Sequence, residues 1–442
     1  MPTEVDSSPA ARRSAVAAAY LAWTLDALDY FLVVFVLSRI AHDFGTEVKD
    51  VTFALFLTLA FRPLGALLFG RIADHFGRRP ALMASVVAYS VMEFASALSP
   101  SLAIFLALRA LFGIGMGGAW GVGASLAFES IPVRHRGTVS GLLQSGYPTG
   151  YLLAAVVFGL LVPAIGWRGM LVVGTAPALL SWFILAKVEE SPTWLQARRA
   201  RTAPRSPSAA ETGSGAIPDG RSGASMLAIL GRHWSLTLYA IVLMTAFNFF
   251  SHGTQDLYPT FLGSQRGLST GAISRIAILY NLGAMCGGIA FGRLSSRIGR
   301  RKTIALAAVL SLPALPFWAY STSTPAIAAA AFVMQFMVQG SWGVVPVHLN
   351  ELSPEGVRAT FPGVVYQLGN LLAAANAPLQ AYLAVWRGGT AHPDYAFALT
   401  LICVAVIPIL ILLALLGPER RDIRFEGVAP AAAPAPTARS VL

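Results

Sequence analysis

Residues 248–260, which read NFFSHGTQDLYPT, gather side chains that can exchange a proton and bind a polar ligand. On an α-helix, Asn248, His252, Gln255 and Asp256 fall within about 100° of arc and therefore share one face. Pro259 has no N–H, so the backbone carbonyl of Gln255 loses its helical partner and is free to face a cavity. A lone histidine would be read as a packing residue, but this combination predicts a site of proton exchange, carried by His252 and Asp256.

Four more charged side chains lie inside apolar stretches, where a charge is costly unless it is paired or hydrated. Asp26 and Asp29 are about 60° apart on a helix, and two carboxylates in one low-dielectric cavity favour uptake of a proton. The guanidinium groups of Arg62 and Arg109 can bind a carboxylate through two hydrogen bonds. We therefore expect the two aspartates to carry protons and the two arginines to contact an anionic substrate. The alternative is a static salt bridge between an aspartate and an arginine.

The composition requires that these side chains be positioned by helices in a membrane. The chain has 442 residues, of which 55% are hydrophobic and only 12% charged, against about 25% charged residues in soluble domains. Its mean hydropathy is +0.63. Twelve stretches have the roughly 20 residues needed to cross a bilayer as helices, and none shows the alternation of a barrel strand. They are Ser14–Leu37, Val51–Gly70, Pro80–Leu98, Leu102–Phe128, Thr138–Pro163, Arg168–Lys187, Leu236–Leu262, Gly271–Leu294, Thr303–Ser321, Pro325–His348, Phe361–Val385 and Tyr395–Leu416.

The distribution of Lys and Arg predicts the orientation. Of the 32 basic residues, 24 fall in the termini and the connections on one side of the membrane, 6 fall on the other side and 2 lie inside spans. The basic side is expected to be cytoplasmic, so both termini lie in the cytoplasm. The net charge of +11 then reflects membrane topology, and nucleic acid is not an expected partner.

An internal repeat divides the chain into two halves. Residues 70–79, GRIADHFGRR, align with residues 292–301, GRLSSRIGRR, at an offset of 222, and the same offset places Trp120 on Trp342. Each half has six predicted spans, which is the pattern of parallel repeats. The predicted domains are an N-terminal bundle (1–188), a Ser-, Pro- and Gly-rich cytoplasmic linker (189–232), a C-terminal bundle (233–418) and a disordered cytoplasmic tail (419–442).

The repeated motif also supplies candidate gating residues. Asp74 can pair with Arg78 or Arg79 at the cytoplasmic ends of the helices and act as a latch that holds the outward-facing state. In the second copy, Arg300 and Arg301 are present, but Ser296 replaces the aspartate. The alternative is that these arginines only follow the excess of basic residues on the cytoplasmic side.

Three motifs together resemble the major facilitator superfamily: GxxxDxxGRR at residues 70–79, ExxPxxxR at residues 129–136 and EESPTWL at residues 189–195. The resemblance covers nearly the whole chain. It implies an all-α membrane protein with twelve transmembrane helices in two six-helix bundles. It also implies alternating access, in which the bundles rock around a central site, and a monomer in a bacterial inner membrane.

Residues 248–260 resemble more narrowly the NxxS/THxS/TQDxxxT signature of Jen-type lactate and monocarboxylate:proton symporters, within the sialate:proton symporter family. In this resemblance Gln367 and Asn370 match a QxxN substrate-contact pair, and Arg62 matches an arginine of the second helix. Gln144 and Ser145 occupy the quasi-symmetric region to Gln367 and are added as substrate contacts. The alternative for these amides is hydrogen bonding between helices.

Other chemistry finds no support in the sequence. Gly113, Gly115 and Gly118 match G-x-G-x-x-G, but they lie inside a predicted span, where close helix packing explains them better. No HExxH or GxSxG motif occurs, and the two cysteines, Cys286 and Cys403, lie in apolar runs. We therefore expect neither an enzyme nor a cofactor or metal site.

These observations predict a proton-coupled symporter of small organic anions in the plasma membrane, with lactate-like monocarboxylates as the favoured class. Its partners are then the anion, the proton and the bilayer. Three alternatives stay open: a proton symporter of sialic or aromatic acids, a proton-driven efflux carrier, and a transporter-like membrane sensor.

Overall fold

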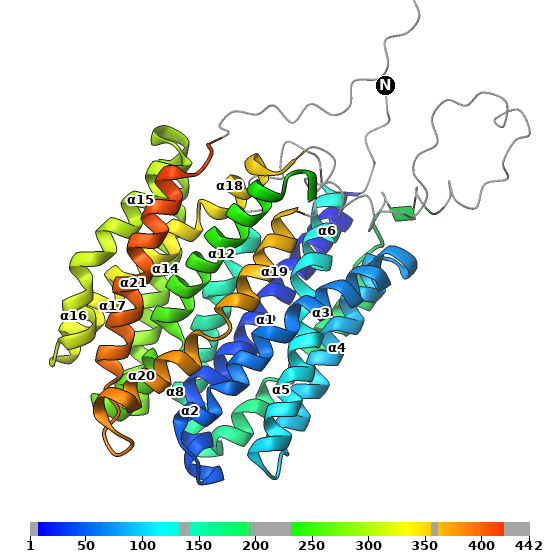
Figure 1. Ribbon diagram of the computed structural model, residues 1–442. Coiled ribbons are helices and arrows are strands. Elements are labelled where there is room, and N and C mark those ends of the chain that lie inside the picture. The colour runs from blue at the N-terminus through cyan, green and yellow to red at the C-terminus, as the bar shows by residue number, and fades with distance from the viewer. Residues whose placement is uncertain are drawn as a thin grey trace, which may run out of the picture.

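The structure is a computed structural model, described here for residues 8–131, 139, 142–191, 194, 195, 198, 231–354 and 361–419. The predicted linker 189–232 and tail 419–442 fall largely outside these residues, as do Pro132 and Arg136 of the second motif. Within the described ranges every regular element is a helix, which confirms the predicted all-α class. The helices run side by side along one common direction (Figure 1).

The first half of the chain builds eight of these helices. They are α1 (Pro9–Phe44), α2 (Val48–Val51), α3 (Phe53–Phe76), α4 (Arg78–Ala97), α5 (Leu102–Gly117), α6 (Ala119–Ser130), α8 (Gly146–Val173) and α9 (Ala178–Lys187). The α1 helix begins with a hydrogen bond from the Ala11 N–H to the Ser8 hydroxyl, 3.1 Å long, which is an ordinary N-cap.

The second half is cut into more pieces. They are α12 (Trp234–Gln255), α13 (Tyr258–Thr260), the π-helical turn η3 (Phe261–Gln265), α14 (Thr270–Ile298), α15 (Arg300–Ser311), the 3₁₀ turn η4 (Leu312–Ala314), α16 (Leu315–Tyr320), α17 (Thr324–Trp342), α18 (Val345–Leu352), α19 (Phe361–Ala373), α20 (Asn376–Gly388) and α21 (Tyr395–Leu416).

The predicted spans correspond to these helices. Among the described residues, ten helices are long and apolar enough to cross a membrane. The sixth predicted span (Arg168–Lys187) is divided between the end of α8, at Val173, and α9, which starts at Ala178. Gly166, with a φ of 66°, interrupts α8 just before this span and separates it from the fifth. The eleventh is divided between α19 and α20. Both contain enough apolar residues for a span, but each is broken into pieces that are individually short.

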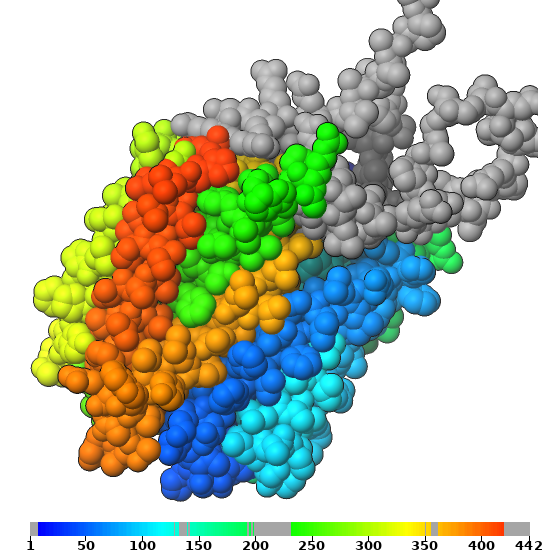
Figure 2. Space-filling view, in the orientation of Figure 1, coloured from blue at the N-terminus to red at the C-terminus, as the bar shows by residue number. Residues whose placement is uncertain are grey.

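The two halves of the chain lie on opposite sides of the molecule, as the blue-to-cyan and yellow-to-red surfaces of Figure 2 show. Within the halves, α1 packs on α8 and α12 packs on α19. Between the halves, α8 packs on α14 and α3 packs on α19. The α3, α8, α14 and α19 helices therefore lie where the halves meet, while the exact domain boundaries stay a prediction.

The repeated motif forms the same turn twice. Gly77, between α3 and α4, and Gly299, between α14 and α15, have φ values of 114° and 99°, which glycine adopts without strain. The carboxylate of Glu190 accepts a hydrogen bond of 2.9 Å from the Arg78 N–H, and that of Glu419 accepts one of 2.8 Å from the Arg300 N–H. A carboxylate thus caps the helix that follows each turn, and it occupies the space that a side chain at the glycine would need.

The glycines of residues 113–118 pack helices, as the sequence indicated. A Cβ atom added at Gly113 would lie 2.2 Å from the carbonyl oxygen of Thr58, and one at Gly117 would lie 2.1 Å from that of Arg62. Both contacts are with the backbone of α3, which cannot give way easily. These glycines therefore set the close approach of α5 to α3 and position the side chains of Thr58 and Arg62.

Candidate functional site

The α12 helix breaks at the residues that the sequence singled out. It ends at Gln255, Asp256 serves as its C-cap, and α13 starts at Tyr258. The freed carbonyl of Gln255 accepts a hydrogen bond of 3.2 Å from the hydroxyl of Tyr151 in α8. The Gly253 carbonyl accepts another, of 2.8 Å, from the amide of Gln380 in α20. The broken turn is thus stabilised by polar side chains of two neighbouring helices, one of them from the other half.

His252 and Asp256 form a triad with a tyrosine of the first half. The Nδ1 atom of His252 lies 3.1 Å from Oδ1 of Asp256. The hydroxyl of Tyr30, in α1, donates to Oδ2 of Asp256 over 3.0 Å and lies 3.4 Å from Nδ1 of His252. All three side chains are buried. Tyr30 directly follows Asp29, but the sequence did not identify it as a site residue. Its role depends on a contact with Asp256, which lies 226 residues further along the chain.

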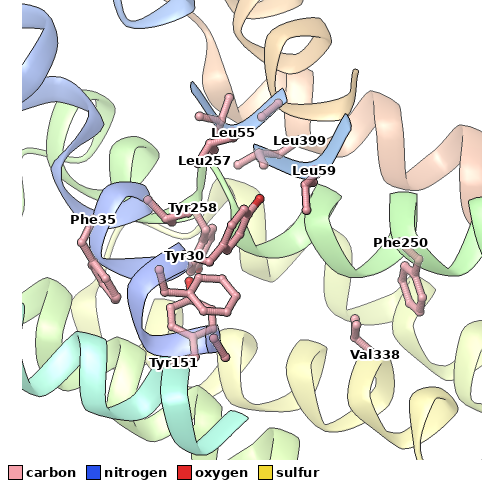
Figure 3. Packing of buried hydrophobic residues seen from close by; sticks show 14 of the residues in the cluster. Tyr30, Phe35, Leu55, Leu59, Tyr151, Phe250, Leu257, Tyr258, Val338 and Leu399 are labelled. Carbon is pink, nitrogen blue, oxygen red and sulfur yellow. The ribbon is translucent and has the colours of Figure 1, made fainter. Parts of the chain in front are cut away.

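Figure 3 shows the apolar surroundings of this triad. Tyr30 of α1, Tyr151 of α8, and Leu257 and Tyr258 next to the broken turn all belong to one cluster of buried hydrophobic residues. The Tyr280 hydroxyl donates to that of Tyr151. Side chains from both halves therefore form one continuous apolar core around a few buried polar groups.

A small cavity lies beside the triad, between the halves. The space left in it is about 10 Å³, enough for about one water molecule. It is lined by Trp23, Gln144, Tyr147, Asn248, Ser251, His252, Gln339, Trp342 and Tyr366. These residues come from α1, α8 and the turn before it, α12, α17 and α19, so neither half forms the cavity alone.

Three donors on the cavity's lining residues lack a hydrogen-bond partner among the described residues. They are the indole N–H groups of Trp23 and Trp342 and the amide nitrogen of Asn248. Each of these side chains is less than a tenth exposed. Buried polar groups are rarely left unpaired in folded proteins, so these donors are available to a hydrogen-bond acceptor, either a water molecule or a ligand.

The predicted substrate contacts are only partly gathered here. Gln144 and Asn248 line the cavity. Ser145 is not among the lining residues, and its hydroxyl donates to the carbonyl of Leu142 within the same turn. Gln367 and Asn370 are buried in α19 near the cavity residue Tyr366, but they do not line the cavity in this conformation. Gln339 and Trp342, which do line it, were missed because nothing in the sequence around them marks a site.

Arg62 and Arg109 are each paired with a carboxylate. Arg62 donates to Asp26 over 2.7 Å, and its guanidinium lies 5.8 Å from the centre of the Trp23 ring. Arg62 is not among the residues that line the cavity, although Trp23 is. Arg109 donates to Glu93 over 2.6 Å and packs over the ring of Phe112 at 4.0 Å. The static salt bridge considered as an alternative is present for Asp26, whereas the partner of Arg109 is a glutamate that sequence reasoning overlooked.

Asp29 is the unpaired member of this buried cluster. Neither of its carboxylate oxygens has a hydrogen-bond partner among the described residues, and its side chain is fully buried. Its charged neighbours are Glu93, Asp26 and Arg109. Three carboxylates and two guanidinium groups thus share one buried region, which leaves one carboxylate in excess. Glu93 lies inside the third predicted span, so the rule that identified the other four charges should have found it too.

The comparisons with known proteins agree with this arrangement. The sequence matches the Major Facilitator Superfamily over residues 19–274 and again over residues 241–442. This chain belongs to the Major Facilitator Superfamily. Its members are membrane transporters, so the protein is an integral membrane protein and not an enzyme.

Individual facilitators give more detail. The chain is 31% identical over 375 residues to the "Carboxylic acid transporter protein homolog" of Saccharomyces cerevisiae. This alignment covers 83% of this chain and 60% of the yeast protein. It is 29% identical over 427 residues to the "Probable 4-methylmuconolactone transporter" of Cupriavidus pinatubonensis, covering 95% and 94%. A structure of the xylose transporter XylE from E. coli, in a partially occluded inward open conformation, superposes with a TM-score of 0.69 at 17% identity, covering 94% and 99% of the two chains.

In this facilitator the repeated motif forms matching ion pairs in the two halves. Arg78 pairs with Asp74 at 2.9 Å and with Glu129 at 3.2 Å, and the side chain of Arg79 donates to the carbonyl of Leu185. The Asp74 pairing expected for a latch is therefore present in this conformation. Its role in gating stays a prediction.

The second copy of the motif makes corresponding contacts, except at the position equivalent to Asp74. Arg300 pairs with Glu351 at 3.1 Å and donates to the hydroxyls of Ser295 and Ser296 over 2.7 and 3.5 Å. Arg301 donates to the carbonyl of Ala414 over 2.9 Å. Serine hydroxyls thus take the place of the Asp74 carboxylate. Each of these contacts, in either copy, joins residues of one half.

Proposed function

We propose that this facilitator is a proton-coupled symporter of small organic anions. The observation that supports it best is the set of three partnerless donors on a cavity between the halves, next to a buried His252–Asp256 pair. Hydrogen-bond donors suit a carboxylate, and the imidazole beside them can carry the coupled proton. Two relatives support an organic acid as substrate by their descriptions. One is described as a carboxylic acid transporter homolog, and the other as a probable 4-methylmuconolactone transporter. Monocarboxylates, with lactate as the reference member, are the substrate class.

Two places in the site can hold the coupled proton. His252 and Asp256 exchange hydrogen bonds with Tyr30 across the halves, so a change in their protonation alters a contact that joins the halves. Asp29 is a buried carboxylate without a hydrogen-bond partner among the described residues, which makes it the second candidate for the coupled proton.

The direction of access follows from where the halves touch. Near the end of α1, the Arg39 guanidinium donates to the Thr270 hydroxyl over 3.0 Å, and the hydroxyls of Ser38 and Ser264 lie 3.4 Å apart. If the termini are cytoplasmic, as the basic residues predict, these contacts close the extracellular side. Alternating access must then break them to admit an anion from outside the cell.

The test is Asp256→Asn, assayed in proteoliposomes with radiolabelled lactate and benzoate. We expect accumulation driven by an inward proton gradient to fall at least about tenfold, while exchange of labelled for unlabelled anion is largely retained, because exchange needs no net proton release. Asp43→Asn, an exposed carboxylate near the end of α1, is the control and should keep both activities. Full proton-driven accumulation in Asp256→Asn, with loss of accumulation in Asp29→Asn, would move the coupling site to α1.

A further inference from the structure

Aromatic side chains enclose the cavity from both halves. Trp23 and Tyr147 lie 5.8 Å apart between ring centres, and Trp342 and Tyr366 lie 6.0 Å apart, all four belonging to the cavity wall. Trp120 joins the two pairs, at 6.2 Å from Trp23 and 5.5 Å from Tyr366. The five rings form one connected array that spans the boundary between the halves.

The internal repeat places an indole on each side of this array. Trp120 and Trp342 are equivalent at the offset of 222 residues, and both contact the ring of Tyr366. Trp120 belongs to the first half and Trp342 to the second. Trp120 is not among the lining residues, but Trp23 of the first half and Trp342 of the second are, so a ligand in the cavity meets a tryptophan from each half.

Two of these indoles also carry hydrogen-bond donors without partners. The N–H groups of Trp23 and Trp342 have no acceptor among the described residues, and neither has the amide nitrogen of Asn248. Polar side chains belong to the same wall, since Gln339, one turn before Trp342 in α17, donates to the Ser251 hydroxyl of α12 over 3.4 Å. The cavity therefore combines flat apolar surfaces with donors around them, which suits a ligand that is itself flat and carries an acceptor group at its edge.

We propose that the preferred anions are planar, conjugated monocarboxylates, such as aromatic acids, rather than small aliphatic acids. This inference rests on the proposed function and narrows its substrate class. A planar body can stack on Tyr or Trp rings while its carboxylate, lying in the same plane, accepts from the donors at the ring edges. A saturated ring of the same size cannot stack face to face.

The space of about 10 Å³ in this conformation does not oppose the proposal, because any organic anion requires the cavity to widen. Parting the two halves separates Trp23 and Trp120 from Trp342 and Tyr366, which opens a slot between ring faces and edges. Such a slot admits a flat molecule at a smaller opening than a bulky one. The arrangement of the rings thus favours a planar anion over one that is merely small.

The experiment is a competition assay in proteoliposomes. Counterflow of radiolabelled benzoate is measured against unlabelled benzoate, cyclohexanecarboxylate and lactate, which separate planarity from size and charge. We expect benzoate to compete at a concentration at least about tenfold lower than either of the others, which is the effect of roughly one aromatic pair. Equal competition by cyclohexanecarboxylate or lactate would overturn the preference and leave the proposed function standing. Absence of counterflow with both labelled benzoate and labelled lactate would overturn both.

Variants test whether the rings cause the preference. In Trp342→Leu the advantage of benzoate over cyclohexanecarboxylate should shrink towards unity, whatever the change in the overall rate of exchange. Trp342→Phe keeps a ring and removes the N–H, so it should retain the advantage with a weaker affinity for every acid. Trp182→Leu is the control, because Trp182 in α9 is 75% exposed on the outer surface. An unchanged advantage in Trp342→Leu and in the corresponding Trp120→Leu would remove the aromatic array from substrate selection.

Discussion

At the scale of single residues, Asp29 and Glu93 are two buried carboxylates that differ in whether they have a partner. Glu93 is bound by Arg109 at 2.6 Å, and both are buried, so each charge compensates the other. Asp29 is equally buried but has no such partner among the described residues. A buried charge that loses its partner destabilises a protein by about 3–5 kcal/mol. The paired carboxylate is therefore structural, and the unpaired one is free to change its protonation.

This difference predicts opposite effects on stability. If Asp29 carries the proton proposed for it, Asp29→Asn replaces one neutral group by another of the same shape, and we expect a change in unfolding free energy below about 1 kcal/mol. Glu93→Gln leaves the guanidinium of Arg109 unpaired, and we expect a loss of about 3–5 kcal/mol. Thermal unfolding of the two purified variants in detergent measures both. A loss in Asp29→Asn as large as that in Glu93→Gln would mean that Asp29 is charged and paired.

At the scale of helices, the approach of α5 to α3 decides where Arg62 lies. The contact at Gly117 is made to the carbonyl oxygen of Arg62 itself, so the thickness of a side chain at position 117 would shift the backbone that carries the guanidinium. Arg62 in turn binds Asp26 and contacts Trp23. Packing of small residues is thus linked through one backbone segment to the wall of the cavity.

Gly117→Ala tests this link, with Gly121→Ala as its matched control. The added methyl group of the first variant would lie 2.1 Å from the Arg62 carbonyl oxygen, whereas that of the second meets nothing within 4 Å. We expect Gly117→Ala to lose about 1–3 kcal/mol of stability through overpacking. Gly121→Ala should be neutral or gain up to about 1 kcal/mol from its higher helix propensity. Equal melting temperatures for the two variants would contradict the packing role.

At the scale of the whole molecule, transport depends on whether the two halves can part at the end of α1. Ser38 and Ser264 approach each other there from opposite halves, with 3.4 Å between their hydroxyl oxygens, and both are accessible. Tyr30 adds a buried contact to Asp256 deeper in the same interface. Alternating access requires these contacts to form and break in each cycle.

A cross-link across this interface should therefore stop transport. The double variant Ser38→Cys, Ser264→Cys, made on a Cys286→Ser background because Cys286 is exposed, should lose anion exchange on oxidation and regain it on reduction. Each single cysteine variant serves as the control and should stay active under both conditions. Exchange at full rate in the oxidised double variant, with the disulfide shown to have formed, would mean that this end does not open.

The sequence alone determined the class of the protein and the local features of its site. Membrane-spanning length and apolar composition are properties of continuous segments, so the spans could be predicted without coordinates. The internal repeat and the absence of the HExxH and GxSxG motifs could likewise be read directly from the sequence. The pairing of His252 with Asp256 could be predicted for the same reason, because residues four apart on a helix are neighbours.

The tertiary structure decided which distant side chains meet. Tyr30 reaches Asp256, Glu93 rather than an aspartate binds Arg109, and Gln339 and Trp342 join the cavity while Ser145 does not. Each of these outcomes depends on the register and rotation of one helix against another. That arrangement is set by side-chain packing summed over whole interfaces, and no spacing within a single segment encodes it.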